Sequence, residues 1–269
     1  MKTERFEIKN RHGLKLVIQV DSPDNPQNLA FVCHGRGGAM IQTHIQAFGQ
    51  AFLENNFRVV YFDSTNSLGQ SGGDMLNLTY DTYFADLEDV ISWSRQQPWF
   101  QEPFALCGHS LGAQAVAWYA EHHPNAVKYL APIAPVVNFE LYSKTMAPGY
   151  LEKWQKDGFV AEPSRSLPGV IGKTGWGLVE SQKKYDLLPM ADKLTMPVFF
   201  MAGEFDQPCP YENQIILFDR IPSKNKKFVK IGGAEHSFRN AKTQVYGKEV
   251  QEAKQVLSSW LRDVNRLTT

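Results

Sequence analysis

The sequence predicts a doubly wound α/β fold, in which helices cover both faces of a mostly parallel central sheet. Short apolar runs suited to buried strands alternate along the chain with longer segments in which apolar residues recur at helical spacing. Polar loops rich in glycine follow several of the apolar runs, and in such sheets chemistry collects where the strands end. The length of 269 residues and the apolar content of 43% fit one large domain better than two independent ones.

The expected elements follow one another in a regular order. Two antiparallel strands joined at His12-Gly13 come first, and buried strands alternating with helices follow. The expected strands are 5–10, 14–20, 29–33, 57–62, 104–107, 127–134, 196–201 and 227–231. The expected helices are 40–55, 79–97, 111–120, 210–218 and 245–261. Residues 137–190 interrupt this rhythm and show no clear strand pattern, so we expect a core made of 1–136 and 191–269 with 137–190 as an insert.

Charge and cysteine content argue against several classes of function. Lys plus Arg and Asp plus Glu are each 28, which does not suit a broad electrostatic surface for nucleic acid or an anionic membrane. No apolar run approaches the ~18 residues that a membrane span needs, and the first ten residues lack the apolar core of a signal peptide. The odd count of three cysteines indicates a reducing compartment without a disulfide framework, so we expect a cytoplasmic protein.

The segment GHSLG lies between the apolar run 104–107 and a helical run rich in small residues. In this context G-x-S-x-G predicts a strained turn that lifts the hydroxyl of Ser110 above the sheet, where it can act as a nucleophile. Glycine is required on both sides because a side chain there would collide with the neighbouring strand and helix. A serine hydroxyl needs a base to take its proton as it attacks, so the rest of the chain must supply one.

A base that titrates near neutrality selects histidine. Of the seven histidines, His236 is placed best, in a loop directly after the last predicted strand. The base in turn needs a carboxylate to hold its tautomer and stabilise the imidazolium. The loop after the strand 196–201 offers Glu204 and Asp206, and we favour Asp206 because it lies further from the strand end and can fold back over the sheet.

The negative oxygen of a tetrahedral intermediate needs preorganised backbone N–H donors. Leu111 supplies one at the start of the helix that follows Ser110. Arg36, in the glycine-rich loop HGRGG, is expected to supply the other through its main chain. Whether the guanidinium of Arg36 also binds a substrate carboxylate stays open.

Other chemistries find less support in the sequence. Neither H-E-x-x-H nor Cys-x-x-Cys spacing is present, and no G-x-G-x-x-G follows the first strand, so we expect no catalytic metal and no dinucleotide cofactor. Cys107 lies within a predicted strand, below the turn, and is not expected to be a nucleophile. We expect His109 to pack below the sheet and His34 to stabilise its own loop by hydrogen bonding.

The motifs GHSLG, HGRGG, GEFDQP and GAEHSF, with the order Ser, Asp, His, resemble those of the α/β-hydrolase superfamily. The resemblance covers most of the chain and is strongest to the serine esterase, lipase and serine-aminopeptidase-like branch, which includes monoacylglycerol lipases and cinnamoyl esterases. It implies an α/β-hydrolase fold with Ser110 as nucleophile, Asp206 as acid, His236 as base, and Arg36 and Leu111 as the oxyanion amides.

In this fold class an insert such as 137–190 resembles a cap over the active site. Its aromatic side chains, among them Tyr142, Trp154 and Trp176, line an acyl or aryl pocket or else form the core of the small lobe itself. The most direct interpretation is hydrolysis of a small-molecule carboxylic ester without a cofactor. A thioesterase or a serine aminopeptidase would use the same machinery, and a non-catalytic binding protein of hydrolase fold is the alternative from another class.

Overall fold

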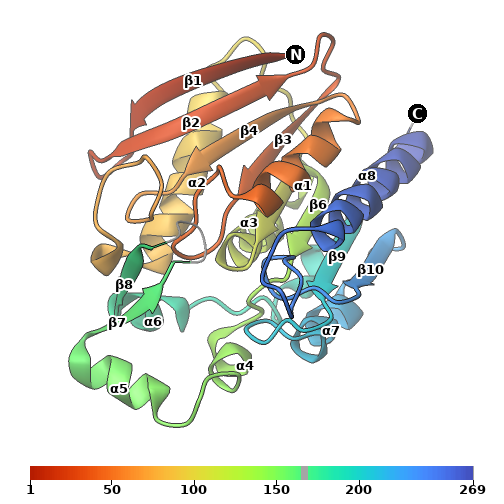
Figure 1. Ribbon diagram of the computed structural model, residues 1–269. Coiled ribbons are helices and arrows are strands. Elements are labelled where there is room, and N and C mark those ends of the chain that lie inside the picture. The colour runs from red at the N-terminus through yellow and green to blue at the C-terminus, as the bar shows by residue number, and fades with distance from the viewer. Residues whose placement is uncertain (165–168, 269) are drawn as a thin grey trace.

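The computed structural model describes residues 1–164 and 169–268. Within them the main sheet has eight strands, in the spatial order β1-β2-β4-β3-β5-β6-β9-β10, with helices on both faces (Figure 1). The strands are β1 (Lys2–Lys9), β2 (Lys15–Ser22), β3 (Asn28–Cys33), β4 (Phe57–Asp63), β5 (Phe104–His109), β6 (Val127–Ile133), β9 (Val198–Gly203) and β10 (Lys226–Ile231). The doubly wound α/β fold predicted from the sequence is confirmed.

Strand direction brings the ends of the central strands to one edge. β1 and β2 pair antiparallel, as do β2 and β4, which confirms the predicted N-terminal hairpin. All the remaining pairs, from β4 to β10, are parallel. The loops after β3, β5, β9 and β10 therefore leave the sheet at the same edge, where the sequence places its candidate site residues.

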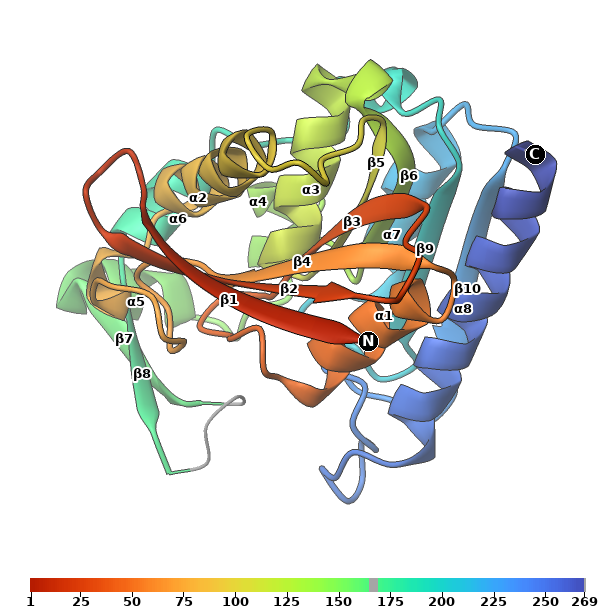
Figure 2. The ribbon, with the colours of Figure 1, turned by 90° about the horizontal axis from the view of Figure 1, so that it is seen from above.

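Helices cover the two faces of the sheet in two groups. α1 and α8 pack side by side on one face, and α2, α3 and α6 lie on the other (Figure 2). The helices are α1 (Thr43–Leu53), α2 (Tyr80–Ser94), α3 (Leu111–His122), α4 (Phe139–Ser143), α5 (Tyr150–Asp157), α6 (Gly177–Gln182), α7 (Tyr211–Arg220) and α8 (Lys248–Thr268). Single turns of 3₁₀ helix are formed by Met75–Asn77, Pro124–Ala126 and Ala191–Lys193.

The central strands are buried on both faces, so their side chains divide between two cores. In β3, Phe31 joins the core under α2 and α3, while its neighbour Val32 joins the core under α1 and α8. Both side chains are fully buried, and burying one of this size stabilises a fold by about 1.5–3 kcal/mol. This two-sided burial explains why the strands appear in the sequence as continuous apolar runs rather than alternating ones.

The insert 137–190 contains more regular structure than the sequence predicts. It forms α4, α5 and α6 and a separate antiparallel hairpin of β7 (Phe159–Pro163) and β8 (Ile171–Gly175). These strands have five residues each, and one carries two glycines, so they are too short and irregular for a clear period-two pattern. In Figure 1 the hairpin and α5 lie together, away from the main sheet. Residues 165–168 of the predicted insert lie outside the described residues.

The cysteine side chains and the described helices bear on two expectations from the sequence, free thiols and no membrane-spanning segment. Cys33, Cys107 and Cys209 are all buried free thiols, and those in β3 and β5 pack as small apolar side chains. Among the described helices, none combines the length and the apolar character that crossing a membrane requires.

Glu121 is a buried acid, and none of the ion pairs among the described residues includes it. Its side chain lies near the end of α3 and is 1% exposed, and in the described part of the chain neither carboxyl oxygen has a hydrogen-bond partner. Burial, with the nearby Asp186 and Asp192, raises the pKa of Glu121 from 4.5 to about 9. At neutral pH Glu121 is therefore a neutral carboxylic acid.

This burial predicts a stability that falls as the pH rises. Unfolded Glu121 loses its proton near 4.5, whereas folded Glu121 keeps it to about 9, so between these values the unfolded state is favoured increasingly. The variant Glu121→Gln has no proton to lose, and its free energy of unfolding relative to the wild type is expected to increase from pH 5 to pH 9. Urea denaturation measures this, with the exposed Glu252→Gln as control. Parallel stability profiles would contradict the assignment.

Candidate active site

The turn between β5 and α3 holds Ser110 in a strained conformation. Its φ of 57° and ψ of −116° place a non-glycine residue in a region that side chains seldom occupy. The flanking glycines make the turn possible, because a Cβ on Gly108 would lie 2.3 Å from the carbonyl oxygen of Gly112. A Cβ on Gly112 would lie 2.3 Å from the carbonyl oxygen of His34. The tight packing predicted for G-x-S-x-G is confirmed.

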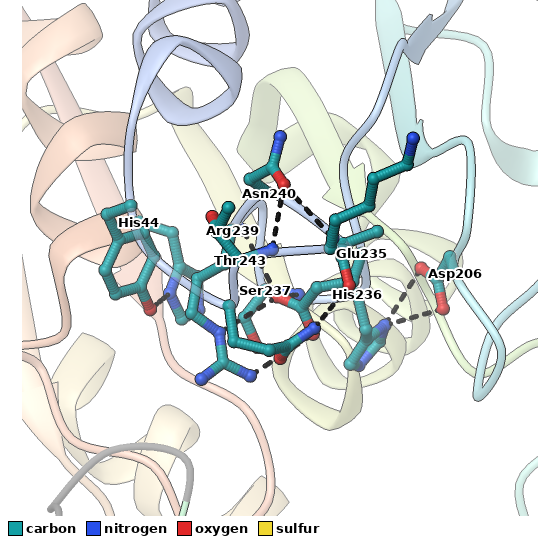
Figure 3. Close-up of polar contacts among 12 residues, drawn as sticks. His44, Asp206, Glu235, His236, Ser237, Arg239, Asn240 and Thr243 are labelled. Carbon is teal, nitrogen blue, oxygen red and sulfur yellow. Dashed lines mark hydrogen bonds and ion pairs between the residues drawn. The ribbon is translucent and has the colours of Figure 1, made fainter.

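His236 and Asp206 form a buried pair. Nδ1 of His236 lies 2.9 Å from both Oδ1 and Oδ2 of Asp206, as Figure 3 shows. The two side chains are 9% and 0% exposed, and the main-chain N–H of Cys209 donates to Oδ1 of Asp206 at 2.8 Å. The carboxylate fixes Nδ1 as the protonated nitrogen and leaves Nε2 as an acceptor. Glu204, the other candidate acid, accepts instead from the N–H of Gly233 at 2.8 Å.

One cavity brings the sequence-predicted residues together. It has a volume of about 690 Å³, and its walls include Ser110, Leu111, His236 and Arg36. These residues come from three of the four loops that leave the carboxyl edge of the sheet. Asp206 comes from the fourth and contacts His236. The cavity also has walls from the insert, so the site lies between the sheet and residues of 137–190.

Two backbone N–H groups on the cavity wall remain available to a ligand. The loop after β3 makes a tight turn in which the N–H of Gly38 donates to the carbonyl of Gly35 at 3.0 Å, with Gly37 at a φ of +57°. Arg36 is the second residue of this turn, so its own N–H is not used to close it. Among the described residues, no acceptor pairs with the N–H of Arg36 or with that of Leu111.

His34 stabilises the loop that follows it. Its Nδ1 donates to the carbonyl of Gly35 at 2.8 Å, and its Nε2 accepts from the N–H of Ser64 at 3.0 Å. Burial lowers the pKa of His34 from 6.5, although the nearby Asp63 opposes this effect. The predicted role of His34 in its own loop is confirmed.

His109 lines the cavity, so the prediction that it packs below the sheet is wrong. It ends β5 at the same edge as the loop after β10, and its Nε2 donates to the carbonyl of His236 at 2.9 Å. His44 Nε2 lies 3.3 Å from His109 Nδ1, and His44 Nδ1 lies 2.9 Å from the hydroxyl of Tyr246. Burial, reinforced by the charges of His236 and Arg239, lowers the pKa of His44 to about 3, so its imidazole is neutral.

The loop that carries His236 is braced by its neighbours. Nε of Arg239 donates to Oε1 of Glu235 at 3.2 Å, and the N–H of Ser237 donates to the same oxygen at 2.9 Å. Burial opposes the charge of Glu235, yet these contacts hold its pKa below 4.5. Further along, Asn240 donates to Glu249 at 2.6 Å, which ties the loop to the start of α8. The histidine is therefore presented by an ordered loop.

Cys209 lies beside the candidate nucleophile without competing with it. Burial, together with the charge of Asp206, raises the pKa of Cys209 well above 9.0. A thiol that stays protonated at neutral pH is a poor nucleophile.

The three aromatic residues that the sequence suggests for substrate binding take different positions. Tyr142 and Trp154 line the cavity. Trp176 is not among the described cavity-lining residues and packs behind Trp154, with ring centroids 6.1 Å apart at 79°. Trp176 precedes the first residue of α6 and packs, partly buried, against the core under α2 and α3.

Sequence reasoning missed His44, Glu162 and Cys209 as residues of this site. None of them lies in a recognisable motif: His44 is on a predicted helix, Glu162 is a lone acid in the insert, and Cys209 follows the acid loop. Their positions depend on contacts between distant segments, such as the 126 residues that separate Glu162 from Arg36.

The hydrogen bond from His109 to the carbonyl of His236 is expected to contribute to the free energy of unfolding. Removing the donor with His109→Met leaves a buried carbonyl unpaired, which is expected to lower the free energy of unfolding by about 1–3 kcal/mol. His109→Gln places an amide N–H near Nε2 and is expected to recover part of that loss. Chemical denaturation compares the two, with the exposed His12→Met as control. Equal losses in both His109 variants would show that the donor does not matter.

The comparisons with known proteins concern the family and the fold. Residues 24–161 match the family model of the serine aminopeptidases S33. A monoacylglycerol lipase of Mycolicibacterium smegmatis is 23% identical over 264 residues, which cover 86% of this chain and 89% of that protein. The structure is similar to that of Est1E from Butyrivibrio proteoclasticus with bound ferulic acid, at a TM-score of 0.77 and 21% identity over 96% of this chain and 98% of the other.

It is also similar to mouse alpha/beta hydrolase domain-containing protein 10, at a TM-score of 0.75 and 15% identity over 97% of this chain and 99% of the other. These structural likenesses show the same fold, and the family match extends over half of the chain. The chain therefore belongs to the serine aminopeptidase S33 family, in the esterase and lipase branch of the α/β hydrolases, and is a serine hydrolase.

Proposed function

We propose that this protein hydrolyses a carboxylic ester through an acyl-enzyme on Ser110. The observation that carries the proposal is the meeting of a strained serine turn and a buried His236–Asp206 pair at one cavity. Nucleophile, base and orienting carboxylate are the three groups that acyl transfer through a serine requires. The same cavity offers two unpaired backbone N–H groups, which supports charge stabilisation there.

In the acylation step, Oγ of Ser110 attacks the acyl carbon while Nε2 of His236 takes the hydroxyl proton. The carbonyl oxygen becomes an oxyanion, which accepts hydrogen bonds from the N–H groups of Arg36 and Leu111. The ester bond then breaks, and His236 gives its proton to the departing alcohol. Asp206 holds Nδ1 of His236 throughout and stabilises the imidazolium.

Deacylation repeats these roles with water as the attacking group. Nε2 of His236 takes a proton from water, whose oxygen attacks the acyl carbon and forms a second oxyanion at the same N–H groups. The bond to Ser110 breaks, the serine recovers its proton from His236, and the carboxylic acid leaves. No cofactor is needed at any point of this cycle.

The substrate is proposed to be a small molecule held between the core and a cap formed by 137–190. The cavity volume of about 690 Å³ suits a drug-sized ligand. Tyr142 and Trp154 lie on the cap side of its wall and offer apolar surface to an acyl or aryl group. The similar proteins, a monoacylglycerol lipase and an esterase with bound ferulic acid, support this substrate class.

A serine aminopeptidase is the second candidate, because the matching family model carries that name. Such an enzyme needs a carboxylate near the serine to bind the amino group of its substrate. Among the described residues that line the cavity, Glu162 is the one carboxylate, and Arg36 and Tyr150 already bind it. This engagement favours the ester over the aminoacyl amide. A thioester would use the same machinery. A cytoplasmic location is proposed as well, since all three cysteines are free thiols.

The triad assignment predicts the effect of changing each acid. Asp206→Asn is expected to lower kcat about 10³- to 10⁴-fold, because an amide cannot stabilise the imidazolium or hold its tautomer. Glu204→Gln, in the same loop, is expected to leave kcat within about 2-fold because Glu204 contacts Gly233 rather than His236. Turnover of a p-nitrophenyl ester measures both. A greater loss in Glu204→Gln than in Asp206→Asn would reverse the assignment.

The proposed reaction also predicts which substrates are cleaved. p-Nitrophenyl esters of several chain lengths are expected to be hydrolysed, with a preference that reports the acyl pocket, and aminoacyl p-nitroanilides are expected to be poor substrates. A fluorophosphonate probe is expected to label the wild type at Ser110 and to leave Ser110→Ala unlabelled. Strong anilide turnover without ester turnover would favour the aminopeptidase. Undiminished turnover in Ser110→Ala would refute the acyl-enzyme mechanism.

A further inference from the structure

Arg36 has its main chain in the core and its side chain against the insert. The main chain forms the tight turn after β3, on the cavity wall next to Ser110. The side chain extends to β7, where Nη2 lies 2.9 Å from Oε2 of Glu162. Arg36 therefore connects the turn 35–38, called here the oxyanion loop, with a strand 126 residues further along the chain.

The insert holds the guanidinium from more than one side. The hydroxyl of Tyr150, on α5, donates to Oε1 of Glu162 at 2.6 Å, so both carboxylate oxygens are engaged. The guanidinium carbon of Arg36 also lies over the ring of Trp154, 5.8 Å from its centroid. Nε1 of Trp154 in turn donates to the carbonyl of Thr174, on β8, at 3.1 Å. Each group that holds Arg36 is thus fixed to another part of the insert.

An apolar contact links the same two segments independently. Met75 lies between the oxyanion loop and β8, since a Cβ on Gly37 would come within 2.5 Å of its methyl carbon. On the other side, a Cβ on Gly172 would lie 3.0 Å from the sulfur of Met75. The loop and the hairpin therefore contact one another through an ion pair and through a shared methionine.

The ion pair differs from an ordinary surface salt bridge, which contributes little because both partners are mobile and solvated. The difference does not lie in exposure, since the side chain of Arg36 is 25% exposed and that of Glu162 is 45% exposed. Burial opposes the charge of Arg36, but Tyr142, Glu162 and Tyr150 raise its pKa above the usual value of a guanidinium, so it stays a cation. A second hydrogen bond to Glu162 and the ring of Trp154 restrict the geometry further.

We propose that Glu162 and Tyr150 are positioning residues, which act by clamping the side chain of Arg36 so that its main-chain N–H points at the oxyanion. This inference rests on the proposed function, in which that N–H is one of the two oxyanion donors. Oxyanion donors act only when they are held where charge develops in the transition state. Because the insert holds Arg36 through Glu162 and Tyr150, the position of the insert affects the oxyanion donor and therefore the rate of the chemical step. A loosened clamp therefore lowers kcat rather than raising KM.

A competing role for the same guanidinium is the binding of a substrate carboxylate. In that case Glu162 would occupy the place of the substrate group, and neutralising Glu162 would favour acidic esters. The contacts with Tyr150 and Trp154 favour the clamp, because they fix the ion pair to the insert at the wall of the cavity. The two roles predict opposite effects of one substitution.

The test compares Glu162→Met with Glu152→Gln, a matched control that neutralises an exposed acid on α5 of the same insert. With a short neutral p-nitrophenyl ester, Glu162→Met is expected to lower kcat about 10- to 100-fold with KM within about 3-fold, since losing a whole oxyanion donor costs about 10²–10³. Tyr150→Phe, which removes one hydroxyl, is expected to lower kcat about 3- to 10-fold. Glu152→Gln is expected to match the wild type.

A double-mutant cycle separates positioning from general disruption. Arg36→Met removes the guanidinium but keeps the main-chain N–H, so it is expected to match Glu162→Met in kcat. Combining the two is expected to cost no more than either alone, because both break the same clamp. Melting temperatures identify any variant that fails to fold, in which case Tyr150→Phe decides alone.

Three results would overturn the inference. The first is a kcat of Glu162→Met and Tyr150→Phe equal to that of Glu152→Gln. The second is multiplicative loss in the cycle, and the third is faster turnover of acidic esters by Glu162→Met. Failure of the proposed function is distinguishable, because the wild type would then lack fluorophosphonate labelling at Ser110. If the wild type is labelled and active but the kcat of the clamp variants is unchanged, only the clamp is refuted.

Discussion

The close approach of the β5–α3 turn to the end of β3 is the contact on which the site depends. At Gly112 even a methyl group would lie 2.3 Å from the carbonyl of His34, so α3 packs directly on the backbone of the neighbouring strand. This approach places Ser110 beside the loop that contains Arg36. Because β3 and β5 are parallel neighbours, one pair of glycines determines how near the nucleophile lies to a backbone donor from another loop.

One side of the site is held by hydrogen bonds within the core, and the other side is held by contacts with the insert. On the side held by the core, the loop of His236 is held by the Glu235–Arg239 pair and by Asn240 against α8. Asp206 is equally fixed, since it accepts from the main chain of Cys209 as well as from the histidine. On the other side, the side chain of Arg36 in its turn forms an ion pair with a hairpin whose described strands make a sheet separate from the main one. The two sides therefore differ in what keeps them in place.

The core was predictable from the sequence because its signals are local. Apolar runs in parallel strands, helical spacing between them and glycines at a sharp turn each leave a mark within about ten residues. The predicted strands and helices of the core were confirmed, with shifts of a few residues at most ends, although α8 runs to Thr268 and was expected to end at 261. The choice of Asp206 rather than Glu204 as the neighbour of His236 also agrees with the geometry. Asp206 and His236 each lie in a loop that follows a strand recognisable in the sequence.

The rest could not be read from the sequence because it depends on contacts between distant segments. The hairpin of β7 and β8 has strands of five residues and an exposed face, so periodicity carries almost no signal there. Trp176 and Trp154 are both aromatic residues of the insert, and only the packing of α6 decides which ring reaches the cavity. His109 was expected elsewhere because a motif position does not reveal what lies opposite it in the folded chain.

The arrangement of His109 has a consequence for the electrostatics around His236. His109 donates to the main-chain carbonyl of His236, and the two imidazole rings pack with their centroids 4.6 Å apart. With His109 neutral, the donors run in one direction, from the hydroxyl of Tyr246 through His44 and His109 to that oxygen. Three imidazoles thus lie in contact, and the charge of the His236 ring acts through space on the outer ones, since burial and that charge together lower the pKa of His44.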